Sequence, residues 1–123
     1  MLLSTLWNLY NQYTGAAEEY SQREKRIRAV YNALLPESDS FHDQKEFLKV
    51  IADEYSNGRW KGKSRKTFDE KIDTLMDSMN PCDKKLDKYC DDLNTAAQTA
   101  NRRSGDYIPL ISDVWTQIQN WTN

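Results

Sequence analysis

The sequence predicts an all-α protein, an elongated helical hairpin of the coiled-coil type with an extra N-terminal helix and a short C-terminal amphipathic helix. Apolar residues recur at alternating intervals of three and four along most of the 123 residues. Four glycines and three prolines are too few for a β-sandwich or barrel, which needs a turn signal about every 8–12 residues. With 38% hydrophobic and 29% charged residues, the chain favours narrow helix–helix seams over a wide core.

The length predicts one domain over residues 1-123, because single domains usually hold about 100 to 150 residues. A net charge of -2 gives no general attraction for nucleic acid or for an anionic membrane. The first eight residues contain neither a basic residue nor an unbroken apolar run. We therefore expect no secretion signal and no membrane span.

The first predicted helix covers about residues 2-35. Its apolar line has one charged member, Glu24, which Arg28 can pair with one turn later. Pro36 disfavours helical geometry at Leu35, so we expect a boundary near 35–40. The line consists of Leu3, Leu6, Tyr10, Tyr13, Ala17, Tyr20, Glu24, Ile27, Tyr31 and Leu34.

The second predicted helix covers about residues 40-57. Ser40 and Asp43 form a capping-box arrangement, in which each side chain can bond an amide at the helix start. Phe41, Leu48 and Ile51 then supply an apolar face. The stretch from Ser56 to Gly58 predicts the end of this helix.

The third predicted helix covers about residues 64-103 and carries the longest apolar line. This line keeps its phase across Pro81, which favours one kinked helix over two separate ones. Gly105 predicts its end, and a loop through Pro109 leads to a last amphipathic helix at 110-121. The line consists of Phe68, Ile72, Leu75, Met79, Cys82, Leu86, Tyr89, Leu93, Ala96 and Ala100.

No constellation of catalytic, cofactor-binding or metal-binding residues stands out, so we expect no enzyme and no cofactor. The only histidine, His42, has no second histidine one turn away and is interpreted as a surface or partly buried helical residue. Cys82 and Cys90 are separated by about 12 Å of helical rise, so we expect no disulfide between them.

The turn predicted at residues 58-63 carries the most specific local motif. Gly58 and Gly62 allow a tight reversal of the chain, and Trp60 can fold back over the end of the hairpin. Ser64 is then available as the N-cap of the third helix.

Trp60-Lys61-Gly62 followed by Phe68, placed between two helical arms, resembles the WXG superfamily of type VII (ESX-like) secretion in Gram-positive bacteria. The similarity covers roughly residues 16–104, and the chain looks like the small partners of LXG-domain toxins. The resemblance implies a targeting chaperone that binds the N-terminal helical LXG domain of a toxin in a secretion-competent complex. It also implies a cytoplasmic protein, open to co-secretion, and leaves room for a second small helical partner.

The family's export signal, an aromatic residue followed four positions later by an acid, is incomplete where the resemblance places it. At that place Tyr89 is followed four positions later by Leu93, which is not an acid. In the first helix, Tyr20 is followed four positions later by Glu24 and fits the pattern. The motif therefore does not predict autonomous export, and a chaperone that depends on its partner for the signal stays open.

The two apolar lines are the predicted internal seam or partner interface. Lys61, Lys63, Arg65 and Lys66 form either a solvated loop tip or a docking site for an acidic surface. Two other functions stay open: an immunity protein that binds the toxic domain, and a homo-oligomeric coiled-coil scaffold, for example a homodimer.

Overall fold

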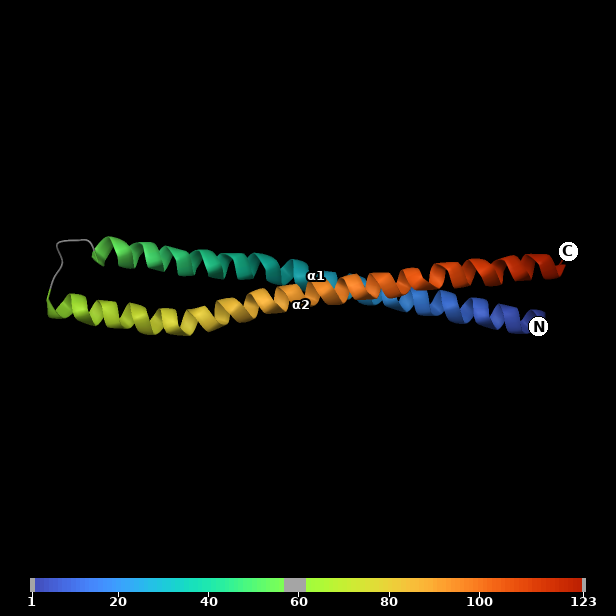
Figure 1. Cartoon of the computed structure of the whole chain (residues 1–123), viewed down its shortest axis with the longest axis horizontal. Helices are drawn as coiled ribbons and strands as arrows, with labels where there is room; N and C mark the ends of the chain where they lie inside the picture. Colours follow the sequence, from blue (N-terminus) through green and yellow to red (C-terminus); the bar gives the residue numbers. More distant parts are fainter. Residues whose placement is uncertain (1, 57–61, 123) are drawn as a thin grey trace. The chain divides into compact units, whose positions relative to one another are not determined.

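A computed structural model describes residues 2–56 and 62–122 of the chain. It contains two helices, α1 (Leu3–Ser56) and α2 (Lys63–Thr122), and the described residues form no strand (Figure 1). The all-α class predicted from the sequence is therefore confirmed.

The chain divides into two compact units, and each unit pairs a segment of α1 with a segment of α2. Unit 1 comprises Met1–Tyr31 and Asp92–Asn123, and unit 2 comprises Asn32–Asp91. The paired segments are antiparallel in unit 1, where Trp7 contacts Trp115 and Tyr20 contacts Tyr107. Such antiparallel pairing of α1 with α2 is the packing of a helical hairpin.

The inward face of α1 follows one unbroken alternation of three and four residues. All ten residues of the predicted line, from Leu3 to Leu34, are buried or half-buried. The same alternation continues in phase to the end of the helix. Its further members are Ser38, Phe41, Lys45, Leu48 and Ala52.

The predicted boundary at 35–40, with a helix start at Ser40, is wrong because α1 continues through Pro36. Proline inside a helix costs about 3 kcal/mol, since it lacks the amide hydrogen and its ring crowds the preceding turn. Pro36 lies on the exposed face, while the inward line keeps its phase on both sides of it. Packing along that line offsets the local cost.

The inward face of α2 shows the same regularity, so the loop predicted at 104–109 and the separate helix at 110-121 are also wrong. Pro81 and Pro109 lie inside α2, and both are exposed. For Pro81 this agrees with the continuous helix that the sequence favoured. The inward line consists of Phe68, Ile72, Met76, Met79, Asp83, Leu86, Cys90, Leu93, Ala97, Ala100, Ser104, Tyr107, Ile111, Val114 and Ile118.

Every second member of the line predicted for α2 is displaced by one residue. Leu75, Cys82, Tyr89 and Ala96 are exposed, whereas the residue after each of them is buried or half-buried. Neighbouring positions on a helix differ by about 100°, so only one of two adjacent rows can face α1. Counting apolar residues selected the wrong row because Asp83 interrupts the right one.

Gly62 sets the start of α2. Its φ is 101°, in the region that residues with a Cβ rarely adopt. Its carbonyl accepts a hydrogen bond from the amide of Lys66 at 3.1 Å, so Gly62 takes the N-cap position predicted for Ser64. The other predicted turn residues, Gly58, Trp60 and Lys61, lie outside the described residues.

Candidate functional site

The core of unit 1 is apolar and aromatic. Leu6, Val114 and Ile118 are buried, and Leu3, Leu9, Tyr10 and Tyr13 pack around them. Trp7, Tyr10 and Trp115 form a cluster with ring centroids 5.6 to 6.1 Å apart. Aromatic pairs at this spacing stabilise a packed interface beyond the area they bury. Much of the predicted line in α1 therefore serves contacts within the chain.

Tyr20 lies at a second aromatic contact in unit 1. Its ring stacks on Tyr107 with centroids 6.2 Å apart. The guanidinium carbons of Arg23 and Arg103 lie 5.1 and 5.8 Å from the centre of the same ring, within cation–π range. Glu24 bonds Arg28 at 2.9 Å, as the spacing predicted. Both residues of the export-like pattern thus have partners within the chain.

Unit 2 contains a polar layer formed by His42 and Lys45 of α1 and Asp83 of α2; Lys45 and Asp83 are buried, as is Ser38, two turns before Lys45. The Lys45 Nζ donates a hydrogen bond of 2.5 Å to Asp83 Oδ2, and His42 Nδ1 lies 3.0 Å from the same oxygen. Within residues 2–56 and 62–122, Asp83 Oδ1 is buried without a hydrogen-bond partner. One carboxylate oxygen of α2 therefore contacts two side chains from α1.

This arrangement shifts the pKa values of two of its members. The hydrogen bond to Asp83, and then the charge of that carboxylate, raise the pKa of His42 above 6.5. The hydrogen bonds from Lys45 and His42 lower the pKa of Asp83 below 3.8, against the opposing effect of burial. Both shifts favour the charged forms of the layer.

Sequence reasoning missed this layer because it searched for apolar residues. The signal was present in the spacing: counting on from Leu34 by four, three and four reaches Ser38, Phe41 and Lys45. The side chain of His42 is 52% exposed, which agrees with a surface or partly buried helical histidine. Its contact with Asp83 depends on a residue of the other helix, which no local pattern reveals.

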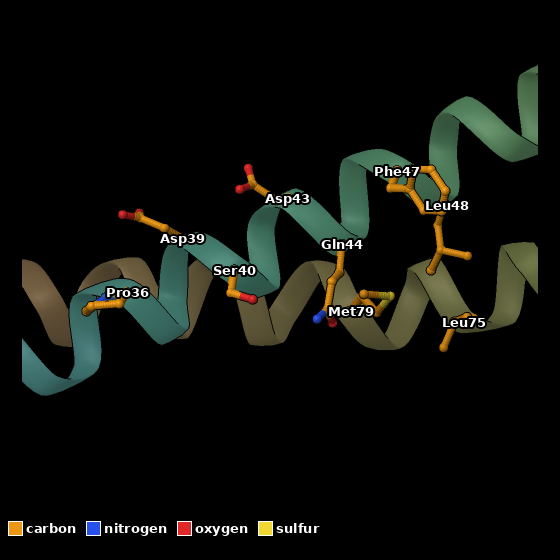
Figure 2. A pocket seen from close by; sticks show the side chains of 9 residues that line it. All are labelled: Pro36, Asp39, Ser40, Asp43, Gln44, Phe47, Leu48, Leu75 and Met79. Carbon is orange, nitrogen blue, oxygen red and sulfur yellow. The ribbon is translucent and has the colours of Figure 1, made fainter.

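An open groove of about 1000 Å³ lies on the surface of unit 2 (Figure 2). From α1, Gln44 and Leu48 extend toward α2, whereas the carboxylates of Asp39 and Asp43 point away from it. Phe47 is 64% exposed. The groove is lined by Pro36, Asp39, Ser40, Asp43, Gln44, Phe47 and Leu48 of α1 and by Leu75 and Met79 of α2.

Three of the four predicted basic docking residues, Lys63, Arg65 and Lys66, lie at the start of α2, and Lys61 lies outside the described residues. Lys63 and Lys66 are exposed. Arg65 is half-buried and approaches Asp69 at 3.6 Å, an ion pair one turn along the helix. Their docking role stays a prediction, as does an interface role for the exposed Leu75 and Tyr89.

Cys82 and Cys90 are both free thiols, the first exposed and the second buried. In the described parts of α1 and α2, no three or more His, Cys, Asp or Glu side chains gather as metal ligands would. Neither helix, over these residues, combines the length and the apolar character that crossing a membrane requires.

Comparisons of the chain with protein-family models, with curated proteins and with solved structures find no match.

Proposed function

We propose that this protein is a non-enzymatic partner that binds the N-terminal helical LXG domain of a type VII secretion toxin and brings it to the secretion apparatus. The observation that carries the proposal is the number of large apolar side chains that stay exposed on the two helices. They are Leu2, Trp7, Val30, Phe47, Val50, Leu75, Tyr89, Ile108, Leu110, Trp115 and Trp121.

Exposed apolar surface of this kind favours binding to another protein. Burying apolar area is worth about 25 cal/mol per Å², and no large side chain in the described residues is completely buried within the chain. Exposed apolar side chains that gather on one surface are typical of interaction sites, and Phe47 and Leu75 line the same groove. A helical partner that covers them would complete a core that two helices alone leave thin.

Two features support the link to LXG toxins in particular. The chain pairs α1 with α2 as a hairpin does, with Gly62 in a conformation suited to chain reversal directly before α2. In the sequence, Gly62 is the glycine of Trp60-Lys61-Gly62, the motif that resembles the WXG superfamily.

Co-purification with the two ends of a toxin tests the proposal. The probe is the product of a neighbouring long gene, split into its N-terminal helical domain and its C-terminal toxic domain. We expect the N-terminal domain to retain this protein and the C-terminal domain not to retain it. The reverse result would identify an immunity protein, and a stable symmetric oligomer that binds neither domain would identify a scaffold.

A pair of substitutions tests the role of the motif in the same assay. Trp60→Ala is expected to weaken retention by the N-terminal domain, whereas His42→Ala, the control, is expected to leave it intact. Equal behaviour of the two variants would contradict the motif's role.

A further inference from the structure

The groove of unit 2 lies beside a row of apolar residues on α2 that α1 does not cover. Leu75, Cys82 and Tyr89 are spaced seven residues apart, and all three are exposed. They adjoin the inward line, which already packs against α1. A helix with apolar residues at the two seam positions and at a flanking position has a face wide enough for two neighbours. In unit 2, α1 covers only part of that face.

The rim of the groove on α1 is acidic. Asp39 and Asp43 lie one turn apart and are exposed, and no ion pair among the described residues includes either carboxylate. Among the residues that the structure describes, the groove lining includes neither lysine nor arginine. Figure 2 shows both carboxylates pointing away from α2, whereas the side chain of Leu48 extends toward it. The groove thus combines an apolar floor with a negative edge on one side.

We propose that this groove binds a third helix, supplied by a partner protein, that has apolar side chains at heptad spacing and lysine or arginine along the flank facing α1. The apolar row would cover Phe47, Leu48 and Leu75, and the basic flank would pair with Asp39 and Asp43. The inference deepens the proposed function and rests on it for the identity of the partner.

Two synthetic peptides test the chemistry of the occupant directly. Both are amphipathic helices with leucine at heptad positions; one carries lysine and the other glutamate along the same flank. Binding to the full chain is followed by fluorescence anisotropy at low salt. We expect the lysine peptide to bind about fivefold more tightly, the effect of two exposed ion pairs. Equal binding, or no binding of the lysine peptide, would overturn the proposal.

Charge variants locate that preference. Asp39→Asn with Asp43→Asn is expected to bring the two peptides to about the same affinity. The matched control is Asp87→Asn with Asp91→Asn, which removes two exposed carboxylates one turn apart on α2 and outside the groove lining. The control should keep the preference. If both pairs of substitutions abolish it, the preference reflects net charge and the groove is not the site.

Replacing an apolar residue of the groove tests whether the peptides bind there. It also shows whether the occupant is a partner helix or a second copy of this chain. Leu75→Ser is expected to weaken the binding of both peptides. Val30→Ser, at an exposed position of unit 1, is expected to leave their binding unchanged. Unchanged circular dichroism verifies that both variants fold. Sedimentation of the free chain provides a further check: a dimer that Leu75→Ser dissociates would mean that a second copy occupies the groove, contrary to the proposal.

The same variants separate this inference from the proposed function. If the LXG domain binds the wild type and the Leu75→Ser variant equally, the groove inference fails and the proposed function stands. If the LXG domain does not bind but the lysine peptide does, with the preference located at Asp39 and Asp43, the groove inference stands and the proposed function fails.

Discussion

Asp83 is the residue at which the two helices of unit 2 are most specifically matched. It takes a seam position of α2 that an apolar residue would ordinarily hold, and its Oδ2 is shared by Lys45 and His42 of α1. A buried carboxylate is costly unless it is paired. The pairing therefore requires Asp83 to lie opposite one particular turn of α1, and slippage of the helices would leave the charge without a partner.

The titration of this layer predicts a pH dependence of stability. The folded-state pKa of His42 is raised above 6.5. The contribution of His42 to the free energy of unfolding is therefore complete below pH 6.5, and it is lost as the pH rises through the raised pKa. Because the pKa of Asp83 is lowered below 3.8, its contribution is present above pH 3.8 and is lost as the pH falls through the lowered value. Both contributions are present between pH 3.8 and 6.5.

His42→Gln tests the upper limit of that window. The urea midpoint of the wild type should exceed that of the variant most clearly near pH 5.5, and the difference should shrink as the pH is raised to about 8.5. Charged groups that act on His42 are Asp83 and Glu46, which raise its pKa, and Lys45, which lowers it. A difference that stays constant over this range would contradict the assignment.

Glycine substitutions should have opposite effects at two positions. Gly62→Ala forces a Cβ into a positive φ at the start of α2 and is expected to lower the free energy of unfolding by about 1–2 kcal/mol. Gly105→Ala, inside α2 with no atom within 4 Å of an added Cβ, is expected to raise it by about 0.5–1 kcal/mol. Urea denaturation measures both, and a loss of stability at Gly105 would be inconsistent with a continuous α2.

At the scale of the elements, long-range periodicity is a better guide than local breakers. Pro36 and Gly105 each carry a recognised signal for the end of a helix and Ser40 one for its start, yet all three lie inside a helix. The signals are real, but each costs only about 1–3 kcal/mol. An inward line that keeps its phase across the signal supplies packing on both sides, so continuing the helix is favoured over ending it.

The contributions of Lys45 and Asp83 to stability should be coupled, because the two side chains come from different helices and bond each other. Lys45→Leu alone leaves Asp83 buried without its closest partner and is expected to destabilise the chain. Lys45→Leu combined with Asp83→Leu fills both seam positions with apolar groups and should recover most or all of the loss. A double-mutant cycle in urea measures the coupling; simple additivity of the two substitutions would show that the layer is not paired in solution.

At the scale of the whole molecule, the two units differ in what holds each of them together. Unit 1 has a buried apolar cluster and aromatic contacts, whereas the buried residues of unit 2 include Ser38, Lys45 and Asp83. The first of the 17 lysines and arginines is Arg23 and the last is Arg103. The two terminal segments, which both belong to unit 1, therefore contain neither lysine nor arginine. Apolar burial contributes more net stability than buried ion pairs do.

Hydrogen exchange should resolve this difference. Amides of unit 1 around residues 6–20 and 97–118 are expected to exchange more slowly than those of unit 2 around residues 38–52 and 66–84, because local opening is easier where few apolar groups are buried. Mass spectrometry of peptic fragments provides the measurement. Equal protection in the two units would contradict the comparison.

The sequence by itself determined that the protein is all-α, that the line from Leu3 to Leu34 faces inward, and that Cys82 and Cys90 do not pair. These features follow from residue type and spacing along one chain. Only the tertiary structure decided which of two adjacent rows of α2 faces α1, that Pro36 and Pro109 are tolerated, and that His42, Lys45 and Asp83 meet. Each of these depends on the opposite helix, because the free energy of packing two helices outweighs local preferences that are worth only a few kcal/mol.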